Sequence, residues 1–81
     1  MDFQELRARL VGHLRERVSS GELTERGLAR ISGVSQPHMH NVLKGKRFLS
    51  VEMSDEVLRQ LRIDILDLVK PEDLIKWRGR R

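Results

Sequence analysis

The sequence contains no cysteine and no tyrosine, and its 81 residues include only two prolines, two phenylalanines and one tryptophan. Without cysteine, the chain has neither a disulfide framework nor a thiolate metal site. No apolar run approaches the ~18 residues that a membrane-spanning helix requires. The first ten residues, MDFQELRARL, also lack the basic and then apolar segments of a secretory signal. We therefore expect a protein of the reducing cytoplasm.

The chain is also short, which limits the functions that it can carry. A domain of this size buries only about 60% of the surface of its unfolded chain, so there is little room for a deep catalytic pocket. No Gly-rich phosphate loop, nucleophile elbow or His-Glu pair at helical spacing supports catalysis. The scarcity of alternating β-branched residues argues against a sheet. The sequence predicts one all-α domain and favours a binding module over an enzyme.

Apolar spacing predicts a first helix from Asp2 to about Ser19, with a core-facing stripe of Phe3, Leu6, Leu10, Val11, Leu14 and Val18. Gly12 inside this helix costs about 1 kcal/mol relative to alanine. Either another helix crosses closely there or the position is suboptimal. Gly21 can adopt the left-handed conformation that ends a helix.

The stretch 24–47 predicts two short helices joined by a tight turn. Thr24 is a suitable N-cap for the second helix, and Gly33 allows the positive φ that a tight turn requires. Ser35 caps the third helix, 35–44, which tolerates proline in its first turn. Its inner face carries Met39, Val42 and Leu43, and its outer face carries Gln36, Pro37, His38, His40 and Asn41.

Further helices are expected after residue 50. Ser50 caps a fourth helix, with a stripe of Met53, Val57, Leu58 and Leu61, and Asp64 caps a short fifth, with Ile65, Leu66, Leu68 and Val69. Pro71 suits the first position of an additional short helix. The apolar residues of that helix, Leu74, Ile75 and Trp77, either complete the core or contact a second subunit. We divide the chain into a domain over residues 1–70 and a short helix with a basic tail over residues 71–81.

The net charge of +4 is unevenly distributed along the chain. Residues 1–25 hold five acids and four bases, whereas residues 26–51 hold five bases and no acid. Residues 52–74 hold seven acids and three bases. The positive block coincides with the second and third helices, which indicates a surface that contacts phosphates.

The sequence from Leu23 to Arg47 resembles the lambda-repressor-like (XRE, Cro-type) helix-turn-helix family. The resemblance covers roughly residues 6–69. The residues on which the resemblance rests are Leu28-Ala29, Gly33-Val34-Ser35, Met39, Val42, Gly45-Lys46 and Leu61-Arg62-Ile63-Asp64 with Leu66 and Leu68. It implies a five-helix domain whose helix 35–44 enters the major groove of double-stranded DNA. One departure is Glu25, where the family often has a glutamine that contacts phosphate.

The outer face of helix 35–44 carries the side chains that we expect to contact base edges, namely Gln36, Pro37, His38 and Asn41. An amide side chain pairs with both N6 and N7 of adenine, which contributes about 1 to 3 kcal/mol of discrimination. His38 donates or accepts, and the Pro37 ring suits a thymine methyl group. Helix 35–44 carries no lysine or arginine before Lys44, so the bidentate guanine contact is missing. We predict an A·T-rich half-site.

Phosphate contacts come from helix N-termini, hydroxyl groups and basic side chains. The predicted contacts are Thr24, Arg26, Arg30, Ser35, Lys44, Lys46 and Arg47. If about six of them engage, the logarithm of affinity should fall with the logarithm of salt concentration with a slope near −5.

The resulting hypothesis is a transcriptional regulator, a repressor in preference to an activator, that binds DNA as a two-fold dimer. The alternative is a protein-interaction module, such as an antitoxin or regulator subunit, that contacts its partner through Leu74, Ile75 and Trp77. We expect no cofactor and no metal, because His38 and His40 lie two positions apart and do not share a helix face.

Overall fold

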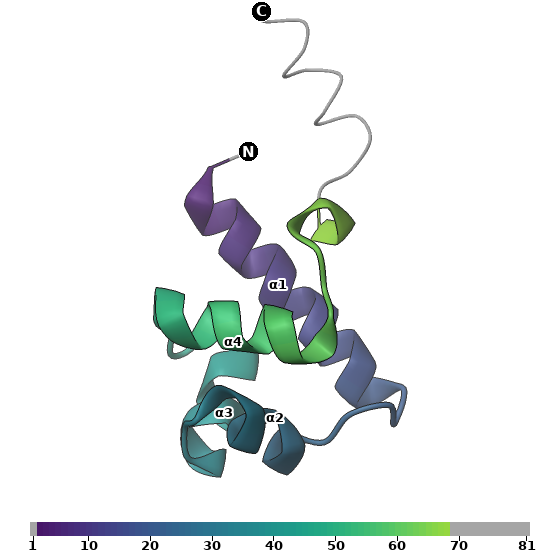
Figure 1. Ribbon diagram of the computed structural model, residues 1–81. Coiled ribbons are helices and arrows are strands. Elements are labelled where there is room, and N and C mark those ends of the chain that lie inside the picture. Colours follow the sequence, from purple (N-terminus) through teal and green to yellow (C-terminus); the bar gives the residue numbers. More distant parts are fainter. Residues whose placement is uncertain (1, 69–81) are drawn as a thin grey trace, which may run out of the picture.

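The computed structural model describes residues 2–68, apart from the side chain of residue 65. Over these residues the chain forms four α-helices, α1 (Phe3–Ser19), α2 (Glu25–Ser32), α3 (Gln36–Leu43) and α4 (Val51–Leu61), and one 3-10 turn, η1 (Ile65–Leu68) (Figure 1). No strand occurs within this range. The predicted all-α class is confirmed. None of the helices in the described range is long and apolar enough to cross a lipid bilayer.

The fifth predicted helix is present as a 3-10 turn within the described residues. Within the described residues it is the single turn η1, in which the Asp64 carboxylate accepts a hydrogen bond from the backbone N–H of Leu66 at 3.0 Å. The Asp67 carboxylate accepts from the backbone N–H of Asp64 at 2.9 Å. These two bonds form a reciprocal capping box, in which Asp64 is the N-cap, as predicted, and Asp67 is three residues further on. Val69 and the predicted helix after Pro71, with Leu74, Ile75 and Trp77, lie outside the described residues.

The α-helices begin at the predicted capping residues. The Thr24 hydroxyl accepts from the backbone N–H of Gly27 at 2.9 Å, and the Ser35 hydroxyl accepts from that of His38 at 3.2 Å. Ser50 caps α4 in the same way, at 3.1 Å from the amide of Met53. Each bond satisfies a first-turn amide that has no acceptor within its own helix.

The turn between α2 and α3 depends on Gly33. This residue has φ 77°, and its N–H donates to the carbonyl of Ala29 at 2.9 Å. A side chain disfavours this left-handed conformation, whereas glycine adopts it freely. Gly33 therefore ends α2 and lets Val34 and Ser35 lead directly into α3.

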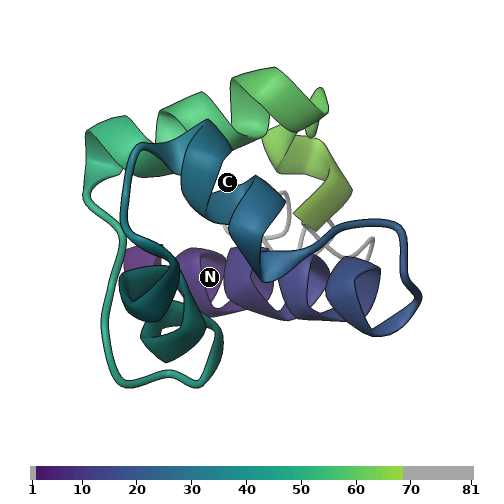
Figure 2. The same cartoon turned by 90° about the horizontal axis from the view of Figure 1, so that it is seen from below.

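The core lies where the helices meet. Figure 2 shows α1 along one side of the molecule and α4 along the opposite side, with α2 crossing the space between them. Every helix contributes buried apolar side chains, and the segments after α3 and α4 contribute others. The buried apolar residues are Leu10, Leu14, Leu28, Ala29, Met39, Val42, Leu43, Leu49, Val57, Ile63 and Leu68.

Two predictions about α1 are settled by its packing. Phe3 was expected in the core but is 55% exposed. It lies in the first turn of α1, where the guanidinium carbon of Arg7 is 5.1 Å from the ring centroid. At Gly12, an added Cβ would meet nothing within 4 Å. No close helix crossing requires this glycine, so the position is suboptimal for helix stability.

Candidate nucleic-acid interface

The predicted base-contacting residues differ in exposure along α3. Gln36 and Pro37 are exposed in the first turn, whereas Asn41 is half-buried in the second. His38 was expected on the outer face, but it is half-buried and its Nε2 is buried without a hydrogen-bond partner in the described part of the chain. It lies one helical turn before the fully buried Val42, which places it at the edge of the core-facing stripe.

The N-terminal ends of α2 and α3 lie side by side. Thr24, Arg26 and Gln36 line one shallow depression, which brings two predicted phosphate contacts next to a predicted base contact. The hydroxyls of Thr24 and Ser35 each accept from a backbone amide within their own helix. A hydroxyl that accepts in this way still has its O–H to donate to an anion. This end of the surface thus presents a guanidinium, two hydroxyl donors and the Glu25 carboxylate, which lines the same depression.

A second basic group follows the C-terminal end of α3. Lys44, Lys46 and Arg47 are exposed, and none of them pairs with a carboxylate of residues 2–68. The loop turns at Gly45, which has φ 80°. The carbonyl of Asn41 accepts from the amides of Lys46 and Arg47, at 2.8 and 3.3 Å. Three basic side chains therefore emerge from a turn that is bonded to the helix itself.

Arg26 lies before the start of α3, and the three basic side chains of residues 44–47 follow its end. The helix between them has eight residues and is about 12 Å long. Arg30 is exposed in the last turn of α2, one helical turn after Arg26. The structure therefore brings Thr24, Arg26 and Ser35 together at one end of α3. It places Lys44, Lys46 and Arg47 at the other end.

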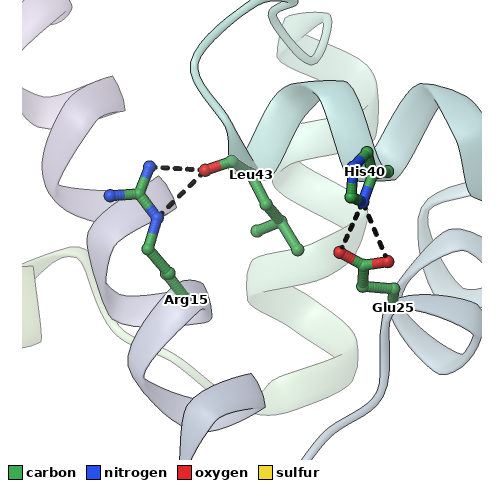
Figure 3. Close-up of polar contacts among 4 residues, drawn as sticks. All are labelled: Arg15, Glu25, His40 and Leu43. Carbon is green, nitrogen blue, oxygen red and sulfur yellow. Dashed lines mark hydrogen bonds and ion pairs between the residues drawn. The ribbon is translucent and has the colours of Figure 1, made fainter.

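A side-chain hydrogen bond between α2 and α3 lies within this surface and was not expected. The Nδ1 of His40 lies 3.0 and 3.2 Å from the two carboxylate oxygens of Glu25 (Figure 3). Glu25, Gln36, Pro37 and His40 line a common depression. Glu25 precedes the acid-free block in sequence, yet in space it lies beside the start of α3. Sequence spacing could not reveal this contact, because it depends on how α2 and α3 cross.

A second unexpected contact fixes the other end of α3. Arg15 of α1 donates from Nε to the carbonyl of Leu43 at 3.0 Å, and its Nη2 binds the same oxygen (Figure 3). Leu43 is the last residue of α3. Its carbonyl has no amide partner within the helix, and a cation is favoured at this end of the helix dipole. Arg15 therefore holds the position of α3 relative to α1.

Nothing in the described part of the chain resembles a metal centre. Residues 2–68 contain no group of three or more His, Asp or Glu side chains close enough to hold a metal ion.

No protein-family model, curated protein or solved structure matches the chain. The resemblance to the lambda-repressor-like family rests on the sequence motifs given above and stays a prediction.

Proposed function

We propose that this chain binds double-stranded DNA sequence-specifically, with α3 in the major groove, and acts in the cytoplasm as a transcriptional regulator of the lambda-repressor-like type. The observation that carries the proposal is the surface around α3. Exposed Gln36 and Pro37 occupy its start, and basic side chains without carboxylate partners among residues 2–68 stand beyond both of its ends.

This arrangement separates two tasks of DNA recognition. Contacts to phosphates set the position and orientation of the protein, whereas contacts to base edges select the sequence. Arg26 at one end and Lys44, Lys46 and Arg47 at the other are placed for the first task. The amides of Gln36 and Asn41 suit the second, because each can bind N6 and N7 of adenine.

The pair of Glu25 and His40 adds a constraint to the proposed interface. A bare carboxylate next to Gln36 would repel phosphates, but this one is bound by the His40 ring. A carboxylate can also accept a hydrogen bond from the N4 amino group of cytosine. Glu25→Gln should therefore strengthen binding to random DNA, and it should cost α2 about 2 kcal/mol at most, since an exposed pair contributes about 0 to 1 kcal/mol and an acid in the first turn about 0.3 to 1 kcal/mol.

The deciding experiment is selection from a randomised duplex library at physiological salt, followed by the same selection with a Gln36→Ala, Asn41→Ala double variant. We expect wild type to enrich an A·T-rich palindrome that the double variant does not enrich. The matched control is Gln60→Ala, which removes an amide from exposed α4 and should enrich the wild-type motif. Circular dichroism of each variant establishes that it is folded.

Salt titration gives an independent measurement. The slope of log affinity against log salt should be near −5 for wild type if about six phosphate contacts form, and Lys46→Ala should reduce its magnitude by about 1. Arg59→Ala removes an equal charge from the exposed side of α4 and should leave the slope unchanged. A slope near zero for wild type, or no enriched motif, would favour a protein-interaction module such as an antitoxin or regulator subunit.

We further propose that the regulator binds as a two-fold dimer and acts as a repressor, with the dimer contact at Leu74, Ile75 and Trp77. This contact is argued from the sequence alone. Trp77→Ala should convert a dimer to a monomer in sedimentation measurements while the far-ultraviolet spectrum stays unchanged. A variant that remains dimeric would remove Trp77 from the contact.

A further inference from the structure

A groove of about 420 Å³ lies between α1 and the loop that follows α3. Its apolar wall is made by Ala8 and Val11 of α1, with the fully buried Val42 of α3 behind them. The volume falls within the range of about 300 to 1,000 Å³ that is typical of small-molecule sites. The proposed base-contacting residues are not part of its lining.

The charged groups around this groove all have one sign. Arg7, Arg15 and Arg47 line it, and no carboxylate does. Arg15 donates to the carbonyl of Leu43, whereas the Arg47 side chain has no hydrogen-bond or ion-pair partner among residues 2–68. An occupant of the groove therefore needs a negative charge to match the guanidinium groups.

One side of the groove is an exposed aromatic ring. Phe48 is 68% exposed, and its ring centroid lies 4.6 Å from the guanidinium carbon of Arg7. This cation–π contact holds the ring beside the charge without neutralising the charge. Phe48 and Arg7 together offer an apolar face and a hydrogen-bond donor to the same ligand.

Gly12 provides an independent indication. It lies inside α1 and lines the groove, and a Cβ built on it would meet no atom within 4 Å. Glycine weakens a helix interior, and here neither a positive φ nor a close helix crossing requires it. The consequence of its missing side chain is that the groove remains open.

We propose that this groove binds a small amphipathic carboxylate. The apolar part of the ligand lies on Ala8 and Val11 beside the Phe48 ring, and the carboxylate is bound by Arg47 and Arg7. A cationic ligand would be repelled by the guanidinium groups. A neutral apolar ligand would cover those groups without giving them an acceptor, which is unfavourable.

The site does not depend on DNA binding, but the two activities would interact. Arg47 is also one of the proposed phosphate contacts, so a ligand carboxylate and a DNA phosphate would compete for the same guanidinium. Ligand binding would then weaken the complex with DNA, as expected of an effector that releases a regulator from its operator.

The test is a titration of the full chain with octanoate, below its micellar concentration, followed by amide NMR. Parallel titrations use 1-octanol and octylammonium as probes with the same apolar chain. We expect saturable shifts for octanoate that are concentrated at residues 8–12 and 45–48. The neutral 1-octanol and the cationic octylammonium should each bind at least about tenfold more weakly than octanoate, because a hydrogen bond to a charged group contributes about that factor.

Three variants make the test specific. Arg47→Ala removes the carboxylate partner, and Gly12→Leu fills the groove while keeping every charge; each should weaken octanoate binding about tenfold or more. Lys46→Ala removes the neighbouring charge, which does not line the groove, and should bind as wild type does. Thermal unfolding confirms that each variant is folded.

The proposal is overturned if 1-octanol binds as tightly as octanoate, or if Gly12→Leu leaves the affinity unchanged. It is equally overturned if the shifts spread over all basic side chains and fall by the same amount in Lys46→Ala and Arg47→Ala. These results do not involve DNA, so failure here leaves the proposed regulator function standing.

Discussion

Replacing Arg15 by methionine should loosen the contact between the end of α3 and α1. In the folded protein, the guanidinium binds the Leu43 carbonyl through both Nε, at 3.0 Å, and Nη2. Methionine keeps a flexible apolar stem of similar reach but has no donor and no charge. The substitution therefore leaves the last carbonyl of α3 without this partner and removes a cation from the negative end of the helix dipole.

The expected loss of stability is the sum of a hydrogen-bond contribution and a helix-dipole contribution. A hydrogen bond involving a charged group contributes about 1.5 to 3 kcal/mol when buried, and this bond is only partly buried, so about 1 kcal/mol is appropriate. The cation at the helix end adds about 0.3 to 1 kcal/mol. Together they give a loss of about 1.5 kcal/mol, which lowers the midpoint of thermal unfolding by about 6 to 12 °C in a domain of this size.

The assay is thermal and urea unfolding of wild type, Arg15→Met, Arg15→Lys and a control, Arg17→Met. Lysine keeps the charge but cannot bind one oxygen through two nitrogens, so its loss should be intermediate. Arg17 forms an exposed pair with Glu22 at 3.1 Å, which contributes at most about 1 kcal/mol. If Arg15→Met is no less stable than Arg17→Met, the contact with Leu43 does not hold α3 in place.

Three substitutions test the backbone and the core by the same unfolding measurements. Gly12→Ala should raise the free energy of unfolding by about 0.5 to 1 kcal/mol, because open space surrounds the added methyl group; a decrease would mean that the glycine is needed. Gly33→Ala should lower it by about 1 to 2 kcal/mol, because φ is 77° there; no change would contradict the strained turn. Leu14→Ala should cost about 2 to 5 kcal/mol, since Leu14 is fully buried. The control for the last, Leu66→Ala at a 65% exposed side chain, should stay within about 0.5 kcal/mol of wild type.

Local features of the fold were predictable because they depend on neighbouring residues. Thr24, Ser35 and Ser50 each bind an amide three residues ahead, and Gly33 has the positive φ that its place in a tight turn required. The 3.6-residue periodicity likewise identified Leu10 and Leu14 as core residues. It failed for Phe3, because periodicity gives the face of a helix but not whether a neighbour extends over its first turn.

The contacts between helices were not predictable in this way. Arg15 meets Leu43 and Glu25 meets His40 only because of the angles at which α1, α2 and α3 pack. For the candidate interface, the sequence predicted individual polar residues, and the structure showed that they form two groups around α3. The half-burial of His38 also came from packing, because its position at the edge of a stripe leaves either placement open.

The loop after α3 is attached to the helix through the main chain of Asn41, whose carbonyl accepts from the amides of Lys46 and Arg47. Every amino acid has that carbonyl, so the attachment does not depend on which side chain occupies position 41. A substitution there changes what α3 presents while the basic loop keeps its anchor. Under the proposed function, a single substitution at position 41 would change the base sequence that α3 selects without a compensating mutation in the loop.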